Sequence, residues 1–422
     1  MTDSSPYAAL KIADFRALLA GRLLGTIALQ IQGMAVGWQI YALTKDPLAL
    51  GLVGLSEALP AIGVALYAGH VADLVDRRKI ALWCIFTLVI CVGALSGCSA
   101  VIKDNNLLTA LIYLIIALSG FARGFYGPAV FGLTGDIVPR EHYANAAAWG
   151  SAAWQASAVA GPIVGGILFL WLAAPATYLI STLLLFGAFL LFLRVKARMK
   201  IQAKKEASVV ENIKEGLQFV FSNQIILASM AMDLFAVLFG GTVALLPIFT
   251  DQIFHMGPQA LGVMRAAPSV GALFVAAYLA HKPITKDAGH IFLVSVAGFG
   301  LCMIGFGLTK NFYIALALLA VSGMLDGISV YLRGTIYQLM TPDDMKGRVS
   351  AVNNIFIGSS NEIGEFESGI TAKLLGLVRS VVVGGSLTLL VVLATAIKAP
   401  QLRKLDMRTL YRASEKEPST TA

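Results

Sequence analysis

Long apolar stretches separated by short polar breaks run through the whole chain. Each stretch has about 20 or more mainly apolar residues, the length of helix that crosses a bilayer core of about 30 Å. The pattern therefore predicts twelve membrane-spanning helices. The predicted spans are 15–42, 48–71, 79–101, 107–133, 143–169, 172–194, 224–249, 259–281, 290–309, 312–338, 349–376 and 380–398. The break between the fifth and sixth spans depends only on Ala173-Ala174-Pro175.

The second half of this pattern repeats the first. The run 53–60 recurs as 261–268, 208 residues later, and the run 119–124 recurs as 322–327, 203 residues later. Charges change sign between the copies, because Glu57 corresponds to Arg265 and Arg123 to Asp326. Ionisable residues inside apolar segments of a duplicated chain are typical of a membrane transporter whose site lies between the two halves.

The fold class predicted from these features is an all-α membrane protein with twelve transmembrane helices in two pseudo-symmetric six-helix bundles. We predict an N-terminal bundle at 1–194 and a C-terminal bundle at 224–398. A cytoplasmic linker at 195–223 joins them, and its apolar residues at helical spacing predict an amphipathic helix along the inner membrane face, with a plain tether as the alternative. Residues 399–422 form a cytoplasmic tail.

Composition and charge support a membrane protein. Hydrophobic residues make up 57% of the chain and charged residues 13%, about half the share in soluble domains. Of the 32 Lys and Arg residues, 23 fall on one side of the predicted topology and 5 on the other. This asymmetry predicts cytoplasmic N- and C-termini in the plasma (inner) membrane. It also accounts for the net charge of +8 without a nucleic-acid partner.

Several kinds of chemistry are not indicated. The chain has no Walker-type phosphate loop, no His/Cys cluster that suits a metal, and no visible nucleophile–base pair, so we expect no enzyme activity, catalytic residue, cofactor or metal. The four cysteines fall within predicted membrane helices, which makes a disulfide framework improbable. The expected partners are the lipid bilayer, a small-molecule substrate and protons, and we expect a monomer.

The loop after the second predicted helix resembles the signature of the major facilitator superfamily, Gly-x-x-x-Asp-basic-x-Gly-Arg-basic. The matching residues are Gly69, Asp73, Arg77 and Arg78. Leu74 and Asp76 depart from the signature. Gly69 would let a second helix approach closely. The resemblance implies a cytoplasmic latch in which Asp73 meets the backbone near the start of the eleventh helix, while Arg77 and Arg78 either join the latch or anchor the topology.

Two further motifs resemble those of exporters in this superfamily. Gly161, Pro162, Gly165 and Gly166 match the antiporter motif Gly-Pro-x-x-Gly-Gly. The alternative is that these small residues only allow close helix packing. Arg123 with Gly127 matches the motif Arg-x-x-x-Gly, whose arginine the resemblance links to proton coupling. An arginine at membrane depth costs several kcal/mol unless it is paired or hydrated.

Four residues are candidates for coupling or gating: Glu57, Arg123, Arg265 and Asp326. Burial favours the protonated form of a carboxyl group, and a nearby arginine opposes that effect. Glu57 and Arg265 occupy equivalent places in the two halves. Glu57 therefore either carries a proton or forms a gating salt bridge with Arg265. The sequence leaves both alternatives open. Asp233, in the seventh predicted helix, is a weaker candidate.

The eleventh predicted helix is unusually acidic. Asn361, Glu362 and Glu365 are the predicted cavity residues there, together with Gln30 of the first helix. Glutamates in a membrane helix are costly unless they face water or partners, and the alternative is that Glu365 and Glu367 lie near the far membrane surface. This stretch and the run 14–22 resemble the subgroup that contains the enterobactin exporter and macrolide efflux proteins.

The predicted function is secondary transport by alternating access, as a proton-coupled exporter of a small organic molecule such as a siderophore or drug. The alternative within the same fold is an importer or a lysophospholipid transporter. A non-transporting receptor is a third possibility, and the buried charges argue against it.

Overall fold

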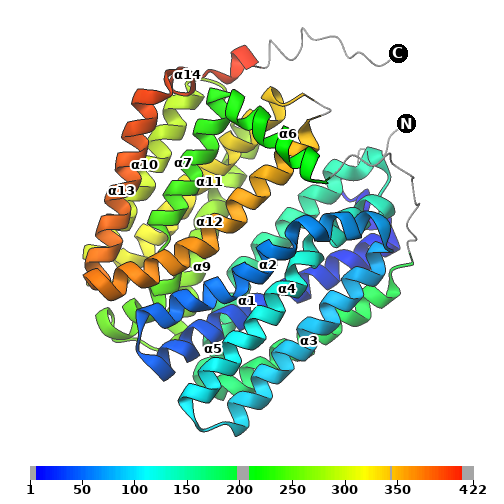
Figure 1. Cartoon of the computed structure of the whole chain (residues 1–422), viewed down its shortest axis with the longest axis vertical. Coiled ribbons are helices and arrows are strands. Elements are labelled where there is room, and N and C mark those ends of the chain that lie inside the picture. The colour runs from blue at the N-terminus through cyan, green and yellow to red at the C-terminus, as the bar shows by residue number, and fades with distance from the viewer. Residues whose placement is uncertain (1–5, 197–208, 343–344, 411–422) are drawn as a thin grey trace. The chain divides into compact units, whose positions relative to one another are not determined.

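The computed structural model describes residues 6–196, 209–342 and 345–410 (Figure 1). Within these ranges, the side chains of residues 65, 66, 70, 73, 209–213, 351, 354–357, 359 and 362 lie outside the description. Every regular element in the described ranges is a helix, as predicted. The chain separates into two compact units, Met1–Lys205 with Ala244–Ala266, and Glu206–Val243 with Ala267–Ala422.

The first unit is built from long helices that pack side by side. Its helices are α1 (Ala13–Thr44), α2 (Pro47–Leu74), α3 (Arg77–Val101), α4 (Asn105–Ile137) and α5 (Tyr143–Arg194). Helix α1 packs against α5, and α2 against α4, while α3 lies against both α4 and α5. Short 3₁₀ turns, η1 (Ala9–Lys11) and η2 (Arg140–His142), precede α1 and α5.

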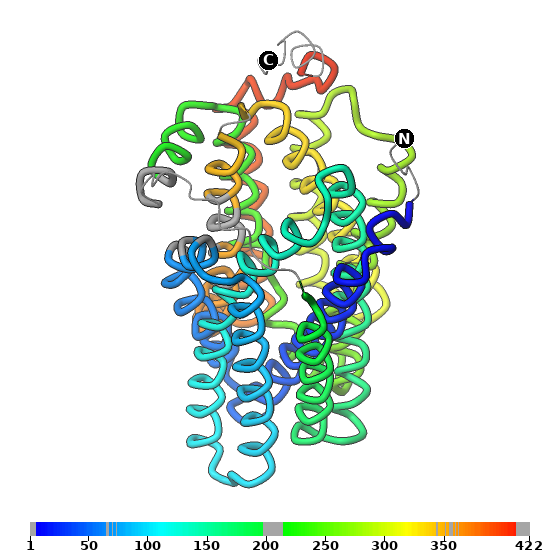
Figure 2. Tube along the Cα trace, turned by 90° about the vertical axis from the view of Figure 1, so that its right-hand side faces the viewer, coloured from blue at the N-terminus to red at the C-terminus, as the bar shows by residue number. Residues whose placement is uncertain are grey.

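Helix α5 is a single run of 52 residues that contains one non-helical residue, Ala173. At 1.5 Å per residue such a run is about 78 Å long, more than twice the bilayer core. Ala173 has φ 57° and ψ −176°, so the helix breaks there, and in Figure 2 the chain of α5 turns back on itself. This is the break that the sequence predicts at Ala173-Ala174-Pro175, which separates the fifth and sixth spans.

The second unit begins with α6 (Val209–Ser222), which lies against α7 (Gln224–Gly240) and α12 (Lys346–Leu375) in Figure 1. Helices α10 (Ala288–Leu308), α11 (Phe312–Met340), α13 (Leu377–Lys398) and α14 (Pro400–Arg403) complete it. Helix α10 packs against α11 and α13, and α7 against α12 and α13. The core between them includes Met230, Phe292, Leu332 and Leu402, each at most 2% exposed.

The chain between α7 and α10 contains several short elements. They are η3 (Val243–Leu245), α8 (Leu246–Ile248), the π-helix η4 (Phe249–Ile253) and the longer α9 (Pro258–His281). The internal contacts assign 244–266 to the first unit and the rest of α9 to the second. The predicted boundaries of the two bundles, the linker and the tail stay predictions.

Ten helical stretches in the described part of the chain are long and apolar enough to span a membrane. One of them covers 140–194 and so contains the two predicted spans that Ala173 separates. Helix α12 is not among the ten, since its middle carries Glu362, Glu365 and Glu367. If the stretch 140–194 is counted as two spans and α12 is added, the ten stretches become the twelve predicted spans.

The helix ends follow the polar breaks in the sequence. Asp46 accepts from the backbone N–H of Leu48 at 3.0 Å, and Pro47 occupies the first turn of α2. Asp104 accepts from the N–H of Asn106 at 2.8 Å at the start of α4. Asn311 does the same for α11, accepting from Tyr313 at 2.9 Å. Such N-caps satisfy backbone donors that have no partner inside the helix.

The internal repeat reappears as repeated helix packing. A Cβ added at Gly120 of α4 would lie 2.9 Å from the carbonyl carbon of Glu57 in α2. A Cβ added at the corresponding Gly323 of α11 would lie 2.5 Å from the carbonyl carbon of Pro268 in α9. In both copies, the absence of a side chain on glycine lets two helix backbones approach closely.

Candidate functional site

The predicted coupling residues of the first unit form an ion pair. Arg123 of α4 contacts the Glu57 carboxylate of α2 through Nη1 and Oε1. The close approach at Gly120 brings the two helices together next to this pair. The side chain of Glu57 is 23% exposed and that of Arg123 is 44% exposed. The pair is therefore partly hydrated, and its two charges compensate each other.

The corresponding residues of the second copy have different surroundings. The Arg265 guanidinium donates through Nη1 to the backbone oxygen of Gly33 in α1 at 2.9 Å, within the first unit. Asp326 of α11 is partly buried in the second unit, and in the described part of the chain it forms no hydrogen bond or ion pair. The gate between Glu57 and Arg265 stays a prediction, since Glu57 contacts Arg123 here.

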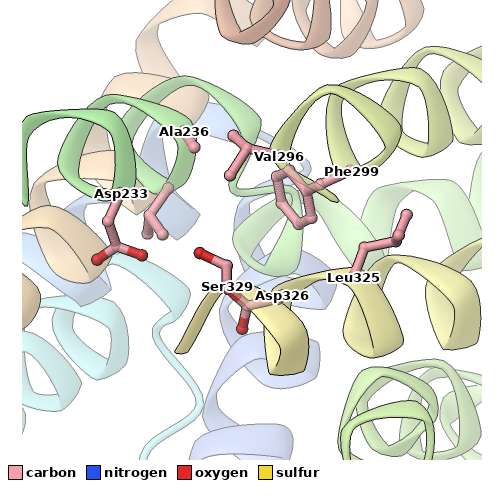
Figure 3. Close-up of a pocket in the computed structure, with 8 residues that line it drawn as sticks. Asp233, Ala236, Val296, Phe299, Leu325, Asp326 and Ser329 are labelled. Atoms are coloured by element: carbon pink, nitrogen blue, oxygen red, sulfur yellow. The ribbon is translucent and has the colours of Figure 1, made fainter. Parts of the chain in front are cut away.

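Asp326 lines a pocket inside the second unit together with Asp233 and Ser329 (Figure 3). Three helices supply the lining side chains: Asp233, Ala236 and Val237 from α7, Val296 and Phe299 from α10, and Leu325, Asp326 and Ser329 from α11. Asp233 is 7% exposed and Ser329 2% exposed. The pocket thus places two carboxylates and one hydroxyl in otherwise apolar surroundings.

Asp233 has a counter-charge that the sequence reasoning missed. Arg333 of α11 contacts the Asp233 carboxylate through Nη1 and Oδ1, and Arg333 is 5% exposed. The signal was present in the sequence, because Asp326, Ser329 and Arg333 follow one another at spacings of three and four and so share a helix face. The partner helix α7 lies about 100 residues away in sequence, and no local pattern links it to α11.

The predicted cytoplasmic latch stays a prediction, and the structure describes the contacts of two of its residues. Arg77 donates through Nη1 to Asp136 of α4 at 3.0 Å, and Arg78 donates through Nη2 to the backbone oxygen of Leu193 at 2.8 Å. Both arginines therefore tie the loop to other helices of the first unit. The expected close approach at Gly69 is not seen, since a Cβ there would have no described atom within 4 Å. The side chain of Asp73 lies outside the described residues.

The start of α12, where the latch was expected to act, is contacted by α6. Glu215 of α6 pairs with Arg348 at 2.9 Å. A Cβ added at Gly216 would lie 2.9 Å from the backbone oxygen of Arg348, so the two helices meet closely there. Val220 of α6 is fully buried and Leu217 packs against the same core. One face of helix α6 thus packs against the other helices of the second unit.

The antiporter-type motif forms a close-packed seam within the first unit. A Cβ added at Gly165 would lie 3.2 Å from the backbone of Ile31, and Gly161 lies against Gln30, both in α1. On the other side, a Cβ at Gly166 would lie 2.6 Å from the backbone oxygen of Pro258. Gly262 likewise approaches the Pro162 carbonyl. The motif therefore has a clear packing role in α5, and a specific role in export stays a prediction.

The predicted cavity residues do not all gather at one place. Gln30 is partly buried where Gly161 meets α1. Asn361 is exposed and Glu365 partly buried on α12, and the side chain of Glu362 lies outside the description. A Cβ at Gly364 would lie 3.1 Å from the Val237 backbone oxygen, so this part of α12 approaches the α7 residues that line the pocket. A shared cavity stays a prediction.

A polar cluster that the sequence reasoning did not identify joins the end of α1 to the π-helix η4. Tyr41 donates to Asp251 at 2.9 Å, and Lys45 pairs with the same carboxylate oxygen at 3.0 Å. Gln252 donates to the Tyr41 hydroxyl at 3.1 Å. Lys45 and Asp251 have side-chain exposures of 58% and 40%, so this ion pair is hydrated and contributes little to stability.

No site in the described residues has the composition of a metal centre. Groups of three or more His, Cys, Asp or Glu side chains that could hold a metal ion do not occur there. The four cysteines are free thiols, and three of them are buried. The charged chemistry of the described chain is therefore that of carboxylates and guanidinium groups within helices.

Comparisons with known proteins agree with this architecture. The family described as transmembrane secretion effector matches residues 4–420. The chain is 26% identical over 340 residues to the enterobactin exporter of Citrobacter koseri, covering 80% of each protein, and 25% identical over 342 residues to that of Shigella flexneri, with the same coverage.

Solved structures show the same fold. A bacterial homologue of the iron transporter ferroportin has a TM-score of 0.70 at 16% identity and covers 94% of this chain and 100% of its own. A bacterial homologue of the human lysosomal transporter Spinster has a TM-score of 0.71 at 14% identity and covers 94% and 98%. At these identities the likeness shows the fold alone. The predicted major facilitator fold is thus confirmed.

Proposed function

The chain belongs to the transmembrane secretion effector family of the major facilitator superfamily, and from this premise we propose that it is a proton-coupled exporter of a small organic molecule. The family and its relatives are membrane transporters, so the chain is an integral multi-pass transporter. Export, proton coupling and alternating access are the proposed part. We also propose a monomer in the inner membrane with cytoplasmic termini, and the distribution of Lys and Arg supports the position of the termini.

The likeness to enterobactin exporters supports the direction of transport and the class of substrate. It extends over 80% of the chain and of each relative, so it covers most of the transport machinery. A siderophore or drug-like organic molecule is the proposed substrate class. At about a quarter identity the residues that select a substrate can differ, and enterobactin is therefore the first probe to use.

The observation that best supports proton coupling is the Asp326 carboxylate. It lies in an apolar pocket, and no described residue forms an ion pair or hydrogen bond with it. An ionised carboxylate in such surroundings is costly, and burial favours the neutral acid. The Asp326 carboxylate would bind one proton and become a neutral carboxylic acid. It would release that proton when the pocket becomes hydrated during the transport cycle.

The Glu57–Arg123 pair supports a different role. The two charges compensate each other, and a neighbouring arginine favours the ionised form of a carboxyl group. We assign this pair to gating, by keeping α2 and α4 together, and not to carrying the proton. Arg265 is placed in the same group, since its guanidinium holds the backbone of α1 at Gly33.

Transport by purified protein in liposomes tests the proposal. Enterobactin is added outside liposomes that contain the protein in both orientations, and a pH gradient is imposed across the membrane. We expect enterobactin to move against the direction of proton flow. A pH-sensitive dye inside the vesicles should report proton movement that depends on enterobactin. A macrolide antibiotic is the second probe. If either probe is transported at a rate that neither the pH gradient nor an uncoupler changes, proton coupling is contradicted.

A further inference from the structure

Two carboxylates line the pocket in the second unit, and one of them contacts a buried arginine outside the lining. Asp233 and Asp326 line it, and Arg333 contacts Asp233. Asp326, Ser329 and Arg333 lie on one face of α11, and Asp233 stands opposite on α7, as Figure 3 shows for the lining residues. Only one of the two carboxylates therefore has a counter-charge, and the other faces a compensated pair.

We propose that Asp233 and Arg333 form a positioning pair that keeps the charge around Asp326 balanced, so that neither a lone arginine nor a second free carboxylate shifts the pH at which Asp326 exchanges its proton. This inference rests on the proposed proton coupling through Asp326. Arg333 is 5% exposed and Asp233 7% exposed, so water screens neither charge well. While the pair is intact, its two charges nearly cancel at Asp326. The pair itself carries no proton through the cycle, because each charge stabilises the ionised form of the other.

The composition of the pocket favours a proton over a metal cation as its occupant. Hard cations such as Ca²⁺ and Mg²⁺ take about six or more oxygen ligands. Only three of the eight lining side chains carry an oxygen, and that of Asp233 already contacts Arg333. The remaining lining is apolar, including Val296, Phe299 and Leu325. A proton needs only the Asp326 carboxylate.

Helices packed against α11 carry other ionisable groups, and of these only Asp233 lines the pocket. The others are His290 and Cys302 on α10, Arg265, Tyr278 and His281 on α9, and Lys346, Arg348, Glu362, Glu365, Glu367 and Lys373 on α12. Tyr313, Tyr331 and Tyr337 lie on α11 itself. The proposal therefore concerns the ion pair whose carboxylate lines the same pocket as Asp326.

The proposal requires that replacing Asp233 and replacing Arg333 shift the proton-binding midpoint of Asp326 in opposite directions. In Asp233→Asn, Arg333 would be left uncompensated and would favour the ionised form of Asp326, so the midpoint of proton binding should fall by about one pH unit or more. In Arg333→Gln, two carboxylates would face one pocket, and the midpoint should rise by about one pH unit or more. The double variant restores the charge balance and should titrate within about half a pH unit of the parent.

Infrared difference spectroscopy of the purified full-length protein in lipid nanodiscs measures this midpoint without a substrate. The carboxylic acid C=O band is followed as a function of pH, and Asp326→Asn identifies the part of the band that belongs to Asp326. The parent, the two single variants and the double variant are then compared. A role that is only structural would change the unfolding temperature of the variants and would not move the midpoint in opposite directions.

The outcomes separate the inference from the proposed function. A band that titrates unchanged in Asp326→Asn would overturn Asp326 as the proton site, and with it the premise. A band that is lost in Asp326→Asn, with single variants that shift in the same direction or not at all, overturns the positioning pair alone. If neither single variant folds, the double variant decides, since a shift of more than one pH unit there contradicts the proposal.

Discussion

Helices α4 and α11 are copies of one another, and they use buried charge in different ways. On α4, Arg123 contacts Glu57 of the neighbouring α2, and the pair is partly exposed. On α11, the corresponding Asp326 has no such partner in the described chain, and Arg333, further along the helix, forms an ion pair with Asp233. Duplication thus preserved the helix packing, while the charges of the two copies diverged.

From this difference we propose separate tasks for the two copies. A compensated pair between two helices adds specificity to their packing and resists protonation. A carboxylate without a counter-charge in an apolar pocket is suited to binding and releasing a proton. We therefore propose proton exchange on α11 and gating on α4, and each of the following substitutions tests one part of that division.

Removing Arg333 should produce the largest loss of stability. Arg333→Ala leaves Asp233 buried without its partner, which costs about 3–5 kcal/mol in the free energy of unfolding. Chemical or thermal unfolding in detergent measures the loss. The matched control is Asp233→Ala with Arg333→Ala, which removes both charges and should recover most of it. A double variant as unstable as Arg333→Ala would show that the ion pair is not the cause.

Filling the repeated glycine contacts should be the next largest effect. Gly120→Ala and Gly323→Ala each force a methyl group against a helix backbone, at Glu57 and Pro268, and should cost about 1–3 kcal/mol. On the same helices, a Cβ at Gly127 or Gly334 would meet no described atom within 4 Å. Alanine at these two control positions should stabilise the helix by up to about 1 kcal/mol. Equal effects at contact and control positions would contradict the shared packing.

Breaking the pair on α4 should have the smallest effect on stability. Arg123→Gln and Glu57→Gln remove an ion pair whose side chains are 44% and 23% exposed, so water compensates part of the loss. We expect a change of at most about 1 kcal/mol. Transport, measured in liposomes, should fall more than stability does if the pair is a gate. A loss of stability as large as that of Arg333→Ala would remove the distinction between the two copies.

The sequence predicted the local features well. Periodic apolar runs located the spans, and the caps at Asp46, Asp104 and Asn311 appear where the polar breaks were expected. The break at Ala173 was also found, although its only signal was two alanines before a proline. These features depend on residues that are close in the chain, which is why pattern and capping rules reach them.

The charge partners were harder to predict, because they depend on which helices meet. The sign change between Glu57 and Arg265 suggested a pair of equivalent residues, which stays a prediction, and the contact of Glu57 with Arg123 was not predicted. Arg333 lies in an apolar segment at helical spacing from Asp326, yet its partner Asp233 comes from a distant part of the sequence. The close contact expected at Gly69 stays a prediction, since a Cβ there would meet no described atom within 4 Å.

The most direct test of the central claim compares proton binding in Asp326→Asn and Glu57→Gln by pH-dependent infrared difference spectroscopy in nanodiscs. Both substitutions remove one carboxyl group and keep the side-chain size. We expect that the carboxylic acid band that titrates in the parent disappears in Asp326→Asn and persists in Glu57→Gln. A band that persists in Asp326→Asn and disappears in Glu57→Gln would contradict it.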